Sequence, residues 1–204
     1  MRKPASSQTK AGVKPSKKKP APHKFRAIFL VGFMGAGKSS VGRALALHLN
    51  WAFEDLDHRI EAREGRTVAD IFRDSGEPAF RLAERAALQA VLEESRDGGE
   101  KVIALGGGAF VQEEIASLLT LAGAPTVFLD ASADELWQRC RKQADDLGIE
   151  RPLLGDSQQF SQLYETRRRA YMNATMRIET GSREIDAITK EIARAVKALR
   201  RDRQ

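Results

Sequence analysis

One short segment near the N-terminus of this 204-residue chain has the residue types and spacing of a phosphate-binding loop. Gly32 to Ser39 reads GFMGAGKS, which fits the pattern G-x-x-x-x-G-K-[ST] at every fixed position. Glycines let successive backbone N–H groups turn around phosphate oxygens where a Cβ atom would clash. Lys38 would reach the β- and γ-phosphates, and the Ser39 hydroxyl would ligate magnesium. The alternative, a glycine-rich turn that only joins a strand to a helix, is weak because the motif has the required strand–loop–helix context. The segment predicts a nucleoside triphosphate site.

Two carboxylates follow the next predicted strand. Asp55 and Asp57 are two positions apart, and residues at that spacing on a strand point to the same face. One carboxylate can then hold the water shell of a magnesium ion while the other orients or deprotonates an attacking hydroxyl. An equally supported interpretation is that Asp57 caps the N-terminus of the helix that begins at His58. The residues alone leave both readings open.

Three further features are candidates for ligand contacts. Arg81 lies one turn into a helix that Gly76 and Pro78 introduce, although a lone helical arginine more often faces solvent. Gly106 to Gly108 end a predicted strand, which indicates either close approach of a ligand to the backbone or a hinge. Arg151 falls in an irregular charged segment, and Arg167 to Arg169 lie on the helix after it. These basic residues fit either a lid over a triphosphate or a solvated charged surface.

The elements that must position these residues alternate regularly along the chain. Apolar runs predict strands at 26–31, 51–56, 101–105, 125–129 and 176–180. Helical patterns fall at 38–50, from 58 to 64, and at 68–72, 78–94, 112–121, 134–143, 160–173 and 185–200, and residues 144–157 read as a loop. Alternating strands and helices imply an α/β fold with a parallel sheet covered on both faces. Ligands bind at the strand ends of such sheets.

The charge is distributed unevenly along the chain. Residues 1–24 hold eight of the 34 Lys and Arg residues and no acid, which leaves 26 basic and 28 acidic residues in the remainder. We therefore expect a disordered basic tail over 1–24 and one domain over 25–204, with a charge of −2, whose net acidity argues against a nucleic-acid-binding body. The sequence shows neither a membrane span nor a secretory signal. A single cysteine, Cys140, fits a cytoplasmic location, and three histidines with one thiol argue against zinc.

Taken together, these motifs resemble those of the shikimate kinase family. The resemblance runs from Phe25 to about Thr180 and rests on the phosphate loop, FEDLD at 53–57, GEPAFR at 76–81, LGGG at 105–108 and RPLL at 151–154. It implies a P-loop kinase fold, with a five-stranded parallel sheet sandwiched by helices and a mobile lid at about 142–157. It also implies Mg²⁺-dependent phosphorylation of the 3-hydroxyl of shikimate by ATP, on the way to chorismate and the aromatic amino acids. A monomer that binds neither a membrane nor a specific nucleic acid is expected.

The same resemblance assigns roles to particular residues. Asp57 would bind the ring hydroxyls and act as general base, and Asp55 would lie near magnesium, mostly through water, beside the metal ligand Ser39. Arg81 would grip the carboxylate of shikimate, and the backbone of Gly107 and Gly108 would face it. The residues expected at ATP are Gly35, Ala36, Gly37, Lys38, Ser39, Ser40 and Arg151, of which Lys38 and Arg151 join Asp57 in catalysis.

Two arginine assignments stay open at this point. The family has a second carboxylate-binding arginine four residues before a tyrosine, which corresponds to Arg167 before Tyr171, with Arg168 a close competitor. The stretch at 142–150 is longer than the usual lid, so either Arg139 or Arg141 can be the arginine that stacks on adenine.

Two other functions are compatible with parts of the sequence. The chain could be another small-molecule kinase, such as a gluconate kinase, although Asp57 with Arg81 favours an acceptor that carries both hydroxyls and a carboxylate. It could also be a regulatory ATPase whose basic tail has nucleic-acid affinity. An aromatic content of 6% and the acidic body argue against that second function.

Overall fold

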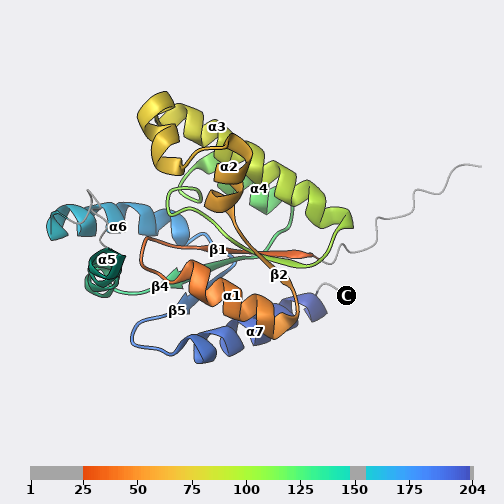
Figure 1. The fold of residues 1–204 in the computed structure, drawn as a ribbon. Helices are drawn as coiled ribbons and strands as arrows, with labels where there is room; N and C mark the ends of the chain where they lie inside the picture. The colour runs from red at the N-terminus through yellow and green to blue at the C-terminus, as the bar shows by residue number, and fades with distance from the viewer. Residues whose placement is uncertain (1–24, 148–154, 203–204) are drawn as a thin grey trace, which may run out of the picture.

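The computed structural model describes residues 25–147 and 155–202, which fold around one parallel β-sheet (Figure 1). Its strands are β1 (Ala27–Val31), β2 (Ala52–Asp55), β3 (Lys101–Ala104), β4 (Thr126–Asp130) and β5 (Met176–Glu179), in the order β2-β3-β1-β4-β5. The helices are α1 (Lys38–Leu49), α2 (Leu56–Glu64), α3 (Val68–Asp97), α4 (Glu113–Leu121), α5 (Ala133–Leu147), α6 (Ser157–Tyr171) and α7 (Ile185–Asp202). The predicted sheet with helices on both faces is confirmed.

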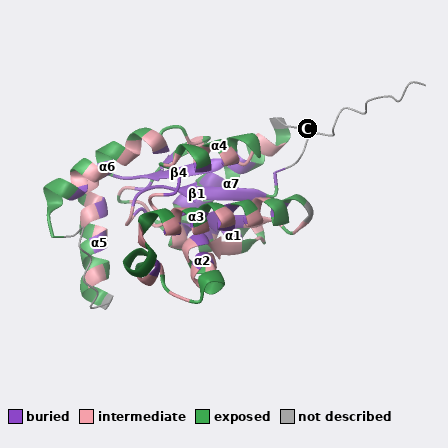
Figure 2. Ribbon diagram, turned by 90° about the horizontal axis from the view of Figure 1, so that it is seen from above, coloured by how far each residue is buried: buried purple, intermediate pink, exposed green. Residues whose placement is uncertain are grey.

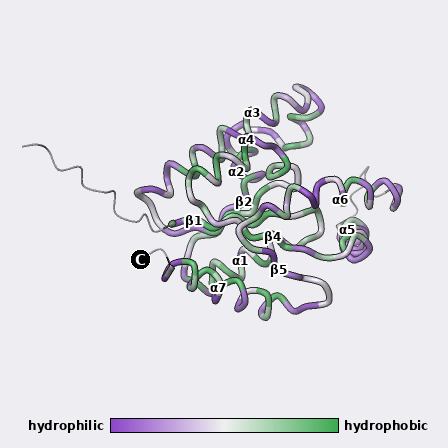
Figure 3. Tube along the Cα trace, turned by 180° about the vertical axis from the view of Figure 1, so that it is seen from behind, coloured by the Kyte–Doolittle hydropathy of each residue, from purple (hydrophilic) through white to green (hydrophobic). Residues whose placement is uncertain are grey.

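The layers follow from the burial of the strands. Every residue of β1 and β4 is buried, because helices cover both faces of a parallel sheet. Helices α1 and α7 pack together on one face, while α2, α3 and α4 lie on the other (Figure 1). The buried residues concentrate in the central strands (Figure 2), and the same strands are hydrophobic in Figure 3. This rigid centre carries the phosphate loop at the carboxyl end of β1.

The turn between β1 and α1 depends on glycine. Gly37 is the residue before the first turn of α1 and has a φ of 83°, in the left-handed region that glycine adopts without strain. Gly35 has a φ of 77°, and a Cβ atom there would lie 2.8 Å from both the Leu136 carbonyl oxygen and Cys140 Sγ. The loop therefore packs directly against α5 and has no room for a side chain at position 35, whereas position 37 requires glycine for its backbone conformation.

Several element boundaries differ from the sequence prediction by up to four residues. Strand β2 ends at Asp55 and α2 begins at Leu56, so the prediction that Asp57 lies on the strand is wrong. The carboxylate of Asp55 accepts a hydrogen bond from the Asp57 N–H (3.2 Å), and this cap starts the helix earlier than the apolar run suggested. Helix α5 continues to Leu147, four residues past its predicted end, because no glycine or proline interrupts it before Gly148.

Helix α3 is bent where the sequence predicted a new helix. Gly76 has non-helical dihedral angles (φ 77°, ψ 171°), and Pro78 follows in the first turn of the second half. The bend sets the direction of the segment that carries Arg81. None of the helices in the described ranges is long and apolar enough to cross a membrane.

Candidate active site

Lys38 lies folded back over the phosphate loop. Its Nζ atom donates hydrogen bonds to the carbonyl oxygens of Gly32 and Phe33, each at 2.9 Å. Burial lowers the pKa of Lys38 to about 8, and the nearby carboxylates of Asp57 and Asp55 oppose that shift. An ammonium group that has lost this much hydration gains strongly from a phosphate anion. The loop residues Gly35, Ala36 and Gly37 lie beside Lys38, while Ser40 is an exposed residue in the first turn of α1.

Ser39 and Asp55 join the phosphate loop to the end of β2. The Ser39 hydroxyl donates to Asp55 Oδ2 at 2.8 Å, while Asp55 Oδ1 accepts from the Asp57 N–H. Asp55 is therefore the N-cap of α2, and the interpretation that Asp57 caps this helix is wrong. The cap leaves the Asp57 carboxylate out of the backbone hydrogen bonds at the helix start.

Asp57 is half-buried and faces other charges. Its Oδ1 atom is buried and has no hydrogen-bond partner among the described residues. Burial raises the pKa of Asp57 to about 6, with further contributions from the carboxylates of Asp55 and Glu84, against the lowering effect of Lys38. A carboxylate with a pKa near neutral pH and a free oxygen has the properties of a general base.

The three consecutive glycines lie against the charged side chains of the site. A Cβ atom on Gly106 would lie 2.8 Å from Asp57 Oδ1 and 3.2 Å from Glu84 Oε1. A Cβ atom on Gly108 would lie 2.8 Å from Arg81 Nη2. None of the three has a positive φ. Space for the site, rather than backbone flexibility, accounts for glycine at 106 and 108, which favours the ligand interpretation over the hinge.

Arg81 is held in place by two carboxylates instead of facing solvent. Its Nη1 donates to Glu84 Oε2 at 2.7 Å, while Nε and Nη2 donate to Glu77 Oε1 at 3.0 and 2.8 Å. The Arg81 side chain is 23% exposed, and that of Glu84 is fully buried. The guanidinium group also lies over the Phe80 ring, 5.2 Å from its centroid. The solvent-facing alternative for Arg81 is wrong.

Sequence reasoning missed Glu84 and Gln112. Glu84 Oε2 accepts from both Arg81 and the Gln112 side chain (2.7 Å), whereas Glu84 Oε1 has no hydrogen-bond partner in the described part of the chain. The spacing of Glu84, three residues after Arg81 on a helix, was the available signal, because residues at that spacing are neighbours. No local signal pointed to Gln112, which comes from the segment before α4.

The geometry distinguishes between Arg167 and Arg168. Arg168 donates to Asp130 Oδ2 at 2.9 Å and to the Tyr164 hydroxyl at 3.1 Å, inside a polar network under α6. Arg167 lies over the Phe33 ring, at 5.6 Å from its centroid, and makes a long hydrogen bond of 3.5 Å to the Gly107 carbonyl. The Tyr171 hydroxyl donates to the same carbonyl. Arg167 is therefore the arginine beside the phosphate loop and the glycine segment.

The arginines expected around the nucleotide are less closely tied to the loop. Arg139 donates to the Thr180 carbonyl at 2.8 Å, and Arg141 is exposed on α5. Arg151 and residues 148–154 around it lie outside the described residues. Within residues 25–147 and 155–202, no three His, Cys, Asp or Glu side chains form a group that could hold a metal ion by themselves.

A phosphate loop after the central strand, an acid at the end of β2 and an arginine anchored beside the glycine segment define a P-loop kinase with a small-molecule acceptor. The sequence model of the shikimate kinase family matches residues 34–197, and the chain belongs to this family. The shikimate kinase of Geobacter metallireducens is 38% identical over 84% of this chain and 92% of its own length. The shikimate kinase of Caulobacter vibrioides is 40% identical over 79% of this chain and 77% of its own length.

Comparison with solved structures also relates this chain to a shikimate kinase. Shikimate kinase from Acinetobacter baumannii, in complex with shikimate, superposes with a TM-score of 0.74 at 31% identity, over 86% of this chain and 95% of that one. A gluconokinase from Sinorhizobium meliloti covers 88% of this chain and 96% of its own with a TM-score of 0.53 at 19% identity, which shows a shared fold only.

Proposed function

We propose that this protein transfers the γ-phosphoryl group of ATP to the 3-hydroxyl of shikimate, giving shikimate 3-phosphate and ADP. The observation that carries the proposal is the pairing of two unlike groups across the glycine segment. Gly106 adjoins the carboxylate of Asp57, and Gly108 adjoins the guanidinium of Arg81. A base beside Gly106 and a fixed cation beside Gly108 suit an acceptor that carries both a hydroxyl and a carboxylate. The step would serve the synthesis of chorismate and the aromatic amino acids.

Arg81 and Arg167 would bind the carboxylate. A guanidinium group has five N–H donors, and Arg81 uses three of them on Glu77 and Glu84. The two that remain can pair with both oxygens of a carboxylate, and the buried Glu84 prevents the guanidinium from swinging away. The backbone of Gly107 and Gly108 would then face the ring of the substrate. Binding fixes the acceptor and turns its hydroxyl toward Asp57.

Asp57 would receive the proton of the attacking hydroxyl. Its pKa of about 6 leaves most molecules ionised at neutral pH, and its Oδ1 atom has no competing partner among the described residues. Lys38 and the backbone N–H groups of residues 35–40 would hold the phosphates in line with that hydroxyl. Arg151 would stabilise the negative charge that spreads over the transferring group.

Magnesium is the metal that the family uses with ATP, and two oxygen donors fit it. Ser39 Oγ and Asp55 Oδ2 are 2.8 Å apart at the end of the phosphate loop. Mg²⁺ is usually held by one or two carboxylates together with substrate phosphates and water, so a three-residue protein cage is not required. When bound, the ion would supply positive charge to the phosphates, with Ser39 as a direct ligand and Asp55 acting mostly through water.

A coupled assay of ADP release tests the proposed reaction. With magnesium-ATP, shikimate should produce a saturable rate that gluconate and nucleoside monophosphates do not produce. A rate that any of those acceptors supports as well as shikimate would refute the assignment. The tail at 1–24, the lid at about 142–157, a monomeric state and a cytoplasmic location stay predictions.

A further inference from the structure

A hollow lies on the α1–α7 face, away from the phosphate loop. It has a volume of about 710 Å³ and is lined by the last turn of α1, the residue before β2 and one side of α7. The lining includes His48, Trp51, Lys190, Arg194, Lys197 and Arg200. Because a helix rises about 1.5 Å per residue, the 12-residue α1 places this hollow about 15 Å or more from Lys38 at its other end. We call it the α1–α7 groove.

Positive charge in the α1–α7 groove exceeds the negative charge available to neutralise it. The only carboxylate among its lining residues is Glu100, which pairs with Arg200 at 2.7 Å. Lys190 pairs with Asp186, also at 2.7 Å. Arg194 and Lys197 are exposed, and neither makes an ion pair in the described part of the chain. Two uncompensated cations, spaced three residues apart on one helix face, therefore point into the same hollow.

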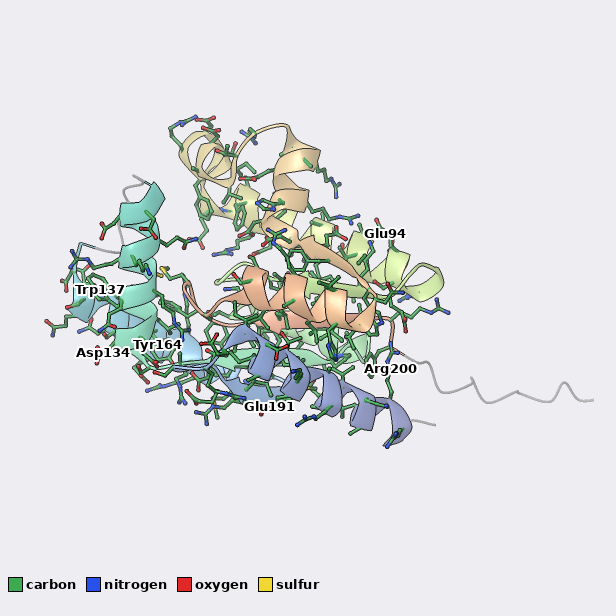
Figure 4. The ribbon with its side chains drawn as sticks, turned by 60° about the horizontal axis from the view of Figure 1, so that its bottom comes forward. Glu94, Asp134, Trp137, Tyr164, Glu191 and Arg200 are labelled. Carbon is green, nitrogen blue, oxygen red and sulfur yellow. The ribbon has the colours of Figure 1, made fainter. Side chains whose placement is uncertain are left out.

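Arg200 forms a rigid wall of this groove. Its guanidinium lies over the Trp51 ring, 4.4 Å from the centroid, and over the Phe25 ring at 5.1 Å. Its Nη2 donates to the Phe25 carbonyl and to Glu100, whereas its buried Nε has no hydrogen-bond partner among the described residues. Arg200 lies toward the C-terminal end of α7 (Figure 4). The wall is thus preformed, and binding would not have to order it.

Interaction with the helix dipole does not explain the basic residues of α7 that line the groove. Cations within the last turn of a helix interact with its dipole, but the effect fades beyond that turn. Helix α7 ends at Asp202, so Lys190, Arg194 and Lys197 all lie outside its last turn. Hydrophilic and hydrophobic positions alternate along α7 (Figure 3), as in any helix packed on one side. The feature that needs a further explanation is the shortage of acids in the groove itself.

We propose that the α1–α7 groove binds a small organic anion that carries at least two carboxylate or phosphate groups. Its volume is in the range of small-ligand sites, and Leu49, Ala193 and Val196 provide an apolar floor for a carbon skeleton. Arg194 and Lys197 would bind the anionic groups. A nucleic acid fits less well, because Arg200 already occupies a face of Trp51, the single Trp, Tyr or Phe ring among the lining residues.

An NMR titration of the full chain tests this site, with citrate and pyrophosphate as separate probes. The protein has two tryptophans: Trp51 lines the groove, and Trp137 lies on α5, where it serves as an internal reference. The titration is done with the phosphate loop saturated by ADP, because this loop packs against α5 and would itself bind pyrophosphate. We then expect the Trp51 indole N–H signal to shift saturably with at least one probe while Trp137 stays unchanged. A response to citrate alone or to pyrophosphate alone would identify the preferred anionic group.

Charge-matched variants separate the groove from general electrostatic attraction. Arg194→Gln with Lys197→Gln should weaken binding about tenfold or more, the effect of two exposed ion pairs. Arg63→Gln with Arg96→Gln removes the same charge from α2 and α3 and should leave the affinity unchanged. Thermal unfolding of both variants checks that each is folded.

Three results would overturn the proposal. The first is a Trp51 signal that responds to neither probe. The second is equal weakening by both charge-matched variants. The third is binding that survives in the groove variant but disappears when Lys17, Lys18 and Lys19 are changed to Gln, because the basic N-terminal segment would then be the binding element.

Discussion

Replacing Arg81 with alanine separates substrate binding from the structural role of this side chain. The change removes three hydrogen bonds to Glu77 and Glu84 together with the two donors that remain for a carboxylate. A hydrogen bond to a charged partner contributes about 1.5–3 kcal/mol. At about 1.4 kcal/mol for each factor of ten, loss of carboxylate binding raises the KM for shikimate by about 10- to 150-fold. The KM for ATP should stay within about twofold of the wild type, since Arg81 does not contact the phosphate loop.

The same change leaves a buried carboxylate without its cation. Glu84 is fully buried, and an unsatisfied buried group destabilises the fold by about 1–3 kcal/mol. Adding Glu84→Gln to Arg81→Ala removes that charge and should restore much of the lost stability without restoring shikimate affinity. Stability is measured by urea unfolding, and affinity by steady-state kinetics with each substrate varied.

Arg85→Ala is the matched control. Arg85 lies one turn further along α3 and pairs with Glu114 on the surface, with side-chain exposures of 46% and 71%. Its loss should change stability by less than about 1 kcal/mol and leave both KM values unchanged. Arg81→Ala that raises both KM values equally, or that loses shikimate affinity only in proportion to unfolded protein, would refute the role assigned to Arg81.

Four further predictions probe the rest of the site. Asp57→Asn should lower kcat by a factor of about 100 or more, the scale of general-base catalysis, while the Kd for shikimate from calorimetry changes little; a larger change in Kd than in kcat would contradict a role in the transition state. Because the pKa of Asp57 is about 6 and the base must be ionised, kcat/KM for shikimate should fall about tenfold per pH unit below pH 6; a profile flat to pH 5 would exclude Asp57 as the titrating base. Because the pKa of Lys38 is about 8, kcat/KM for ATP should fall as Lys38 loses its proton above that pH, and a rate that rises there would contradict the role of the ammonium. Tyr171→Phe keeps the packing on Phe128 but removes the donor to the Gly107 carbonyl. The KM for shikimate should therefore rise about fivefold or more, the scale of one hydrogen bond, while the KM for ATP stays unchanged. Equal rises in both KM values would indicate a general loss of structure and contradict a specific role in the acceptor site.

The fold could be predicted from the sequence because local patterns and topology agree. The central strands β1, β3 and β4 are apolar runs of the kind that is buried on both faces, and the phosphate loop indicates which strand is followed by the nucleotide site. The errors fell at boundaries. Asp57 was placed on a strand because its spacing from Asp55 fits strand alternation, yet the cap that Asp55 makes starts a helix one residue later.

The candidate site was predictable in part, for reasons that differ from residue to residue. A run of glycines marks Gly106 and Gly108 in the sequence, but only the three-dimensional structure shows that side chains at these positions would collide with Asp57 and Arg81. Adjacent arginines on α6 cannot be told apart by composition. Arg168 is committed to Asp130, a buried acid from β4 that is 38 residues distant in sequence, and no local pattern reveals such a contact. Gln112 was missed for the same reason.

A crystal structure of the full chain with ADP and shikimate bound tests the proposed reaction most directly. We expect the carboxylate of shikimate to lie within hydrogen-bond distance of Arg81 and Arg167, and its 3-hydroxyl to contact the Asp57 carboxylate. A complex in which the carboxylate contacts neither arginine, or in which the 3-hydroxyl lies out of hydrogen-bond reach of Asp57, would contradict the proposed chemistry.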